Sequence, residues 1–262
     1  MASTPTLYKI RLLDTESDLM ASFRLRYEVY RALGYLRSTL ASELEIDEHD
    51  ACALPFGAFD LSTGDLIGTI RLLSSDPHPG YERMIRRVVE ACGDARLAER
   101  VFGERGDLPS ILSPRIAREI AVCNTSGFPV RELSRSITHP DHRGSGVGRG
   151  LMELGLTYAM QDGPVFLVGG CQTEHLPMYA RYGYDKLPHT ELDHFAAVDQ
   201  VANVVVCRTD RLPDPTYSHT RALLRSLLDG DPGHTRPLGC GSQALFTYPS
   251  APEPPAPHAL AI

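Results

Sequence analysis

Apolar residues along most of the chain either alternate with polar ones or recur every three to four positions. Alternation and short apolar runs are typical of β-strands, whereas spacings of three and four indicate the buried face of an amphipathic helix. The pattern predicts strands at residues 7–13, 52–61, 66–73, 130–138, 165–168 and 203–209. It predicts helices at 15–34, 81–102, 114–122, 149–161 and 174–182.

Capping and turn residues support several of these boundaries. The run from Thr15 to Asp18 has the form of a capping box, so we expect the first helix to begin there and to end near Gly34. Residues 62–65, Ser-Thr-Gly-Asp, supply turn chemistry between two strands and predict a hairpin. Gly93 interrupts the helical pattern of 81–102, and Pro177 confines the regular part of its helix to the residues that follow.

The order of these elements is a mixed α/β pattern. It predicts an α/β fold with one twisted sheet and helices on both faces. We expect a single domain over residues 1–210, with a helical insertion near 74–127. Residues 211–262 form a C-terminal extension, in which we expect a short amphipathic helix at 219–228 and disorder from about residue 248, where proline and alanine dominate.

Composition and charge narrow the possible partners and the cellular location. The chain has 262 residues, of which 42% are hydrophobic and 23% charged, as in a soluble globular protein. Its formal net charge of -7 argues against nucleic acid as a partner. We expect no stable membrane insertion, because no apolar run is long enough to span a bilayer. The six scattered cysteines lack CxxC spacing, so we expect reduced thiols in a cytoplasmic protein.

A glycine-rich stretch separates the strand at 130–138 from the helix that follows it. It reads His-Pro-Asp-His-Arg-Gly-Ser-Gly-Val-Gly over residues 139–148. Glycine allows positive φ and close backbone approach, and the N–H groups at a helix start attract an anion such as a pyrophosphate. Arg143 adds a charge-assisted contact. No lysine follows the glycines as in a P-loop, and their spacing is not that of a Rossmann fingerprint.

The arrangement Arg-Gly-x-Gly-x-Gly behind His-Pro-Asp resembles the acyl-CoA loop of the GNAT superfamily of N-acyltransferases, and the order of elements matches the GNAT layout. The resemblance implies that the loop binds the phosphopantetheine end of a thioester. The donor would be acyl-CoA or acyl carrier protein, with acetyl-CoA among the alternatives, and no permanently bound cofactor. The open strand edge would pair with the pantetheine amides. The implied donor-binding residues are Ile137, Thr138, Arg143, Gly144, Ser145, Gly146, Val147 and Gly148.

A second GNAT-like signal lies at residues 175–184. It resembles the Tyr-x-x-x-Gly-Phe/Tyr element of the superfamily, with Tyr179 four residues before Gly183. The resemblance implies that Tyr179 protonates the departing thiolate, a step that a tyrosine hydroxyl can perform. Packing of Tyr179 in an amphipathic helix, with its hydroxyl in water, explains the position equally well.

A set of charged residues lies between positions 20 and 140, namely Arg26, Asp47, Asp50, Arg71, Glu132 and Arg135. This set resembles that of the acyl-homoserine lactone synthases and the related N-acyl amino acid synthases. The resemblance implies that Glu132 is the general base that deprotonates the attacking amine. Arg71 and Arg135 either hold an acceptor carboxylate or pair with acidic residues to order the N-terminal segment. In the strand pleat, Glu132 and Ser134 face one side and Arg135 the other. The implied substrate-binding set is Arg26, Tyr30, Asp47, Asp50, Arg71 and Arg135.

The intact glycine loop departs from the lactone synthases, which generally lack it, and favours the N-acyl amino acid synthases. We therefore expect an N-acyltransferase that moves an acyl group from a CoA or carrier-protein thioester to a small amine, most simply an amino acid. The alternatives are an acyl-homoserine lactone synthase, a short-chain acetyl-CoA N-acetyltransferase and a non-catalytic acyl-CoA sensor. The helical insertion is explained equally by an acyl pocket and by a packing surface.

Two further groups of residues are weaker candidates for chemistry. Cys171 follows two glycines but has no evident base partner, so it is interpreted as a buried thiol, and no acyl-enzyme is expected. Asp47, His49 and Asp50 have some metal-ligand character but no partner cluster in the sequence. They are interpreted as part of a surface loop, and no metal is expected.

Overall fold

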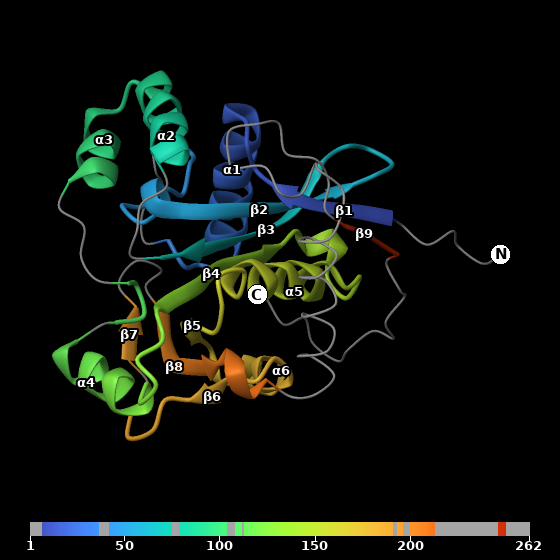
Figure 1. Ribbon diagram of the computed structural model, residues 1–262. Coiled ribbons are helices and arrows are strands. Elements are labelled where there is room, and N and C mark those ends of the chain that lie inside the picture. Colours follow the sequence, from blue (N-terminus) through green and yellow to red (C-terminus); the bar gives the residue numbers. More distant parts are fainter. Residues whose placement is uncertain are drawn as a thin grey trace.

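The computed structural model describes residues 7–36, 42–74, 79–103, 108–111, 113–190, 193–195, 200–212 and 246–249. Within these residues one sheet has the strand order β6-β8-β5-β4-β3-β2-β1-β9, and β7 pairs with β8 off that path (Figure 1). The strands are β1 Leu7–Leu12, β2 Ala53–Asp60, β3 Leu66–Leu73, β4 Val130–Thr138, β5 Phe166–Cys171, β6 Asp185–Lys186, β7 Asp193–Phe195, β8 Gln200–Arg208 and β9 Phe246–Pro249. Neighbouring strands are antiparallel except β4 and β5, which run parallel.

Helices cover both faces of the sheet, as the sequence predicts (Figure 1). They are α1 Glu16–Ala32, α2 Pro79–Cys92, α3 Ala95–Phe102, α4 Pro114–Cys123, α5 Val147–Ala159 and α6 Leu176–Arg181. On one face α1, α2 and α3 share a core, and α4 packs on β5 and β8. On the other face α5 and α6 pack against the centre of the sheet. The insertion near 74–127 thus buries its apolar helical faces in these two cores.

Local sequence signals account for most element ends. The Thr15 side chain accepts a hydrogen bond from the backbone N–H of Asp18, so the predicted cap of α1 is confirmed. Ser113 caps α4 in the same way, and Asp94 caps α3. Gly93 separates α2 from α3 with a φ of 64°, a conformation that glycine adopts without steric cost.

The C-terminal extension contributes one strand to the described residues. Strand β9 pairs antiparallel with β1, matching Tyr248 to Tyr8 and Pro249 to Leu7. Tyr248 and Pro249 therefore lie in a strand at the position where the sequence predicts the start of disorder. The predicted helix at 219–228 and residues 250–262 lie outside the described residues. No helix in the described part of the chain is long and apolar enough to cross a membrane.

Candidate active site

The parallel strands β4 and β5 pair over only three residues and then part. The pairs run from Val130 with Phe166 to Glu132 with Val168. Beyond Glu132, β4 continues to pair with β3 on its other side, up to Thr138. Its edge towards β5 is therefore open from Leu133 onward in the described residues, and that edge includes Ile137 and Thr138. The open edge predicted for these two residues is present, and the pairing of a pantetheine with it stays a prediction.

A bulge in β4 places Arg135 on the same side of the sheet as Glu132 and Ser134. The register between β3 and β4 shifts between Thr69 and Arg71, and Arg135 has a φ of 53°. The expectation that Arg135 faces away from Glu132 is therefore wrong. That expectation assumes an unbroken pleat, whereas an extra residue in one strand turns the following side chain to the other face.

The charged residues of the predicted substrate-binding set form one buried ion-pair network. Arg26 donates to Asp50 at 2.7 Å and 2.9 Å and also to Glu45. Arg71 donates to both Asp47 oxygens at 2.6 Å and 2.9 Å, and Arg135 donates to Asp47 at 2.6 Å. Each of these residues is at most 9% exposed. Of the two alternatives for Arg71 and Arg135, the structure shows pairing with the acidic segment.

The network is balanced in charge and is held in its ionised form. Three arginines from α1, β3 and β4 meet three carboxylates, those of Glu45, Asp47 and Asp50. Burial alone would raise the pKa of Asp47, but Arg71 and Arg135 hold it well below the usual range. Arg26 and Arg71 lower the pKa of Asp50 in the same way against the effect of burial.

Glu132 lies beside this network at the point where β4 leaves β5. Its side chain is 1% exposed, and burial raises its pKa to about 7. Its carboxylate accepts a hydrogen bond of 2.9 Å from the backbone N–H of Ser110, a fully buried residue between α3 and α4. A carboxylate that titrates near neutral pH is suited to general base catalysis.

Tyrosine side chains from other elements lie near Glu132 and the ion-pair network. Burial raises the pKa of Tyr179, and the nearby Cys171, Tyr30 and Glu132 raise it further, so its hydroxyl stays protonated at neutral pH. Tyr184 stacks edge-on against Tyr179, with ring centroids 5.3 Å apart. The Tyr184 hydroxyl is buried with no hydrogen-bond partner among the described residues. Tyr30 lies on α1, and the guanidinium carbon of Arg135 is 5.8 Å from the centroid of its ring.

The glycine loop joins β4 to α5 on the opposite face from the ion-pair network. Gly144 and Gly146 have φ values of 74° and 86°, which other residues rarely adopt. Gly146 is the N-cap of α5, so the N–H groups of Val147 and Gly148 belong to the first turn and lack intrahelical acceptors. The Ser145 hydroxyl donates to the His142 carbonyl within the loop. The buried Nε of Arg143 has no hydrogen-bond partner among the described residues.

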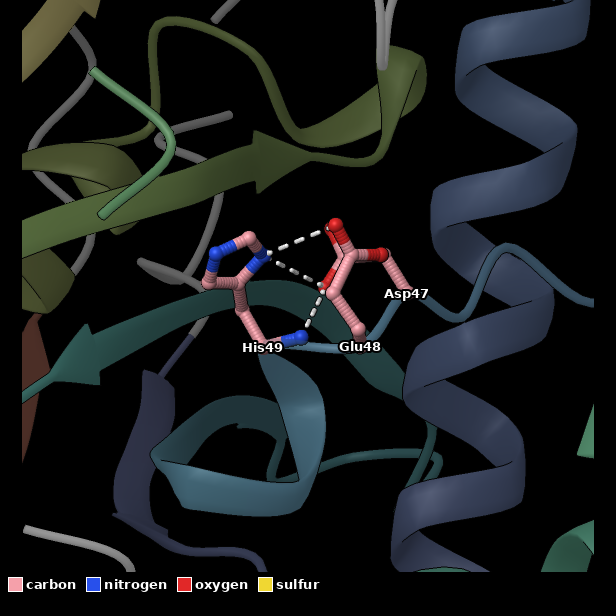
Figure 2. Close-up of side chains that lie close together, drawn as sticks. All are labelled: Asp47, Glu48 and His49. Carbon is pink, nitrogen blue, oxygen red and sulfur yellow. Dashed lines mark hydrogen bonds and ion pairs between the residues drawn. The ribbon is translucent and has the colours of Figure 1, made fainter. Parts of the chain in front are cut away.

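Asp47, Glu48 and His49 bring their side chains within 4.8 Å of one another (Figure 2). Asp47 and His49 are 8% and 7% exposed, so the interpretation of this stretch as a surface loop is wrong. The stretch is buried because Asp47 pairs with Arg71 and Arg135. Both carboxylate oxygens of Asp47 already accept hydrogen bonds from these arginines, and one also accepts from the His49 N–H, so they are poorly available to a metal ion.

Comparison with protein families identifies the fold. Residues 25–96 match a GNAT acetyltransferase domain model, and residues 118–184 match a GNAT acetyltransferase family model. The two matches follow one another and together cover just over half of the chain. The chain belongs to the GNAT superfamily of N-acyltransferases. The GNAT resemblance of its sequence is thereby confirmed, as are the fold class and the acyltransferase activity.

Solved structures share the GNAT fold with this chain. FeeM, an N-acyl amino acid synthase from uncultured soil microbes, matches with a TM-score of 0.53 and 19% identity, covering 82% of this chain and 93% of that chain. TofI, in a ternary complex with an inhibitor and MTA, matches with a TM-score of 0.52 and 16% identity, covering 86% and 99%. No curated protein sequence matches the chain.

Reasoning from sequence missed further residues of this candidate site, among them Glu45 in the ion-pair network, Ser110 and Tyr184. Ser110 reaches Glu132 from between α3 and α4, and no periodic or motif signal marks residues 108–111. Tyr184 belongs to the Tyr-x-x-x-Gly-Tyr element, but only its burial and its contact with Tyr179 single it out. A buried hydroxyl without a partner is uncommon and marks a place where a ligand group can bind.

Proposed function

We propose that this GNAT enzyme transfers an acyl group from a CoA or carrier-protein thioester to the amine of an amino acid or a similar small molecule. The observation that carries the proposal is Glu132, a buried carboxylate whose pKa is raised to about 7 at the end of the β4–β5 pairing. An attacking amine must be neutral, so a base that is ionised just above pH 7 suits this reaction. The fold likeness to an N-acyl amino acid synthase supports the choice of acceptor.

In the proposed reaction the amine nitrogen attacks the thioester carbonyl carbon directly. A C–N bond forms and the C–S bond breaks, while Glu132 takes a proton from the amine, directly or through water. The Tyr179 hydroxyl, which its raised pKa keeps protonated at neutral pH, supplies a hydrogen bond or a proton to the departing thiolate. Cys171 is an unsuitable nucleophile because burial raises the pKa of its thiol to about 12, which supports a mechanism without an acyl-enzyme.

The donor binds in this proposal at the glycine loop, where the first-turn amides of α5 and Arg143 meet its phosphates. The predicted loop residues from Arg143 to Gly148 and the open edge at Ile137 and Thr138 form the donor side. The acceptor side lies along Tyr30 and the ion-pair network. The network's arginines are already paired with carboxylates, so in this proposal the network shapes the acceptor side. Its carboxylate Asp47 holds Arg135 beside Tyr30.

The acylated product that the enzyme makes distinguishes the proposed function from the alternatives. We would express the full chain in a bacterial host and analyse lipid extracts by mass spectrometry, with a Glu132→Gln strain as the matched control. N-acyl amino acids that appear with the wild type and fall sharply in the control are the expected result, and their masses report acyl length and acceptor together. A chain that binds acyl-CoA but releases no free thiol with any amine tested would contradict the proposal and point to a sensor.

A lactone synthase is the second candidate, because the charged set between positions 20 and 140 resembles that family. Acyl-homoserine lactones in the extract, formed only when S-adenosylmethionine is present in a purified assay, would support this candidate. Acetylated amines alone would instead indicate a short-chain acetyltransferase.

A further inference from the structure

Tyr8 lies on β1, outside every motif that predicts the site. Its hydroxyl donates a hydrogen bond of 2.8 Å to the carbonyl oxygen of Gly146, at the start of α5. The residue is 2% exposed, and its strand is paired on both sides, with Asp60 of β2 and Tyr248 of β9 opposite Tyr8. The hydroxyl therefore reaches the glycine loop from a fixed part of the sheet.

The Gly146 carbonyl fixes the direction of the next amide. Gly146 has φ 86° and ψ 0°, and its carbonyl oxygen also accepts the first helical hydrogen bond, 3.0 Å from the Gly150 nitrogen. In a planar trans peptide the following N–H points opposite to the carbonyl. With the carbonyl held by Tyr8 and Gly150, the Val147 N–H points away from the body of α5, in the direction in which the helix start attracts anions.

Close packing leaves Tyr8 little freedom. A side-chain carbon on Gly150 would lie 3.0 Å from the Tyr8 hydroxyl and 2.7 Å from Cδ1 of Ile10, so β1 and α5 approach as closely as glycine permits. Burial raises the pKa of Tyr8, and the nearby Glu153 adds to this, so the hydroxyl stays a hydrogen-bond donor at neutral pH.

We propose that Tyr8 is a positioning residue for the thioester donor, because its hydroxyl sets the Gly146–Val147 peptide in the orientation that the donor's phosphate group needs. The inference rests on the proposed donor site at the glycine loop. Glycine at a left-handed position gives the loop backbone freedom that would have to be lost on binding. The Tyr8 hydroxyl holds this peptide before the donor binds and so reduces the entropy lost on binding. It therefore affects the affinity for the donor and not the acyl-transfer step.

The test is Tyr8→Phe, which removes the hydroxyl and keeps the ring. Isothermal titration with coenzyme A and with 4′-phosphopantetheine should show binding weakened about three- to tenfold, the size of one net hydrogen bond. The donor KM should rise by a similar factor, with kcat at saturating donor unchanged. Tyr158→Phe is the matched control, since this tyrosine packs against Phe56 from the far end of α5, and its Kd should equal that of the wild type.

A double-mutant cycle with Gly146→Ala shows whether Tyr8 acts through this peptide. If it does, Tyr8→Phe adds little further loss on the Gly146→Ala background. An equal loss on both backgrounds, an unchanged Kd in Tyr8→Phe, or a fall in Tm with no change in Kd would each overturn the inference. If the wild type binds neither probe, the proposed donor site is wrong and the inference fails with it.

Discussion

Glu132 is a buried carboxylate at a position where its negative charge lowers the stability of the folded protein. The three arginines nearby are already matched by three carboxylates, so Glu132 has no cation of its own to balance its charge. Burial raises its pKa to about 7. Above that pH the folded protein holds a buried, ionised carboxylate, which costs free energy. Retaining such a group is expected where catalysis needs it.

Glu132→Gln separates the proposed catalytic role of this residue from a structural one. The pKa of Glu132 is higher in the folded than in the unfolded state, so the folded state binds the proton more tightly. The stabilisation that this proton gives is present at low pH and is lost as pH rises from about 4 to about 7. The variant should therefore be more stable than the wild type at pH 8, by up to about 3 kcal/mol in urea unfolding. Its kcat/KM should be about 10²- to 10⁴-fold lower.

The pH–rate profile completes this test. Wild-type kcat/KM should rise with pH and level off above about 7, and the rise should be absent in Glu132→Gln. A variant that is less active and also less stable at pH 8 would show that Glu132 mainly supports the fold.

At the scale of single residues, sequence reasoning succeeded where a local motif fixes the geometry and failed where pairing between strands does. The αL conformations of Gly144 and Gly146 follow from the loop motif. The side to which Arg135 points depends on the register of β4 against β3, which the β4 sequence alone does not contain. The contact of Ser110 with Glu132 depends on how the segment between α3 and α4 folds back over the sheet.

At the scale of elements, periodicity predicted the strands and helices that bury a whole face. It missed β6 and β7, which have two and three residues, because such short strands carry no period. It also missed β9, whose pairing with β1 depends on a neighbour more than 230 residues away in the chain.

The start of α5 is the element on which the proposed donor site depends, and Gly146→Glu tests it. The substitution places a negative charge at the helix N-terminus and forces a side chain onto a φ of 86°. Calorimetry should show coenzyme A binding weakened by at least about a hundredfold. Gly64→Glu is the matched control, because Gly64 has a φ of 79° and open space around it in the β2–β3 hairpin. Similar losses in both variants would contradict the loop assignment.

At the scale of the whole molecule, the candidate site is assembled from both matched parts of the chain. Residues 25–96 contribute Arg26, the acidic segment and Arg71, whereas residues 118–184 contribute Glu132, Arg135, the glycine loop and Tyr179. The ion pairs of Arg135 with Glu45 and Asp47 cross from one part to the other. Sequence order showed both parts and their motifs, but the contacts between them became evident only in the folded chain.

Asp47→Asn should weaken this connection and lower the stability of the entire protein. It leaves Arg71 and Arg135 buried with one anion fewer, so we expect a loss of roughly 3–5 kcal/mol at pH 7 in urea unfolding. Asp162→Asn is the matched control, because its carboxylate is 80% exposed beside Arg131 and should change stability by less than about 1 kcal/mol.

The dependence of the Asp47→Asn loss on pH distinguishes charge from shape. Asp47 has a folded pKa below its unfolded value, so its stabilising contribution is fully present above about pH 4 and is lost as pH falls through the folded pKa. The difference in unfolding free energy between the wild type and Asp47→Asn should therefore narrow below about pH 4, with the ionic strength held fixed. A difference that stays constant with pH would mean that Asp47 supports the fold through its shape and hydrogen bonds, and that its charge is not what joins the two parts.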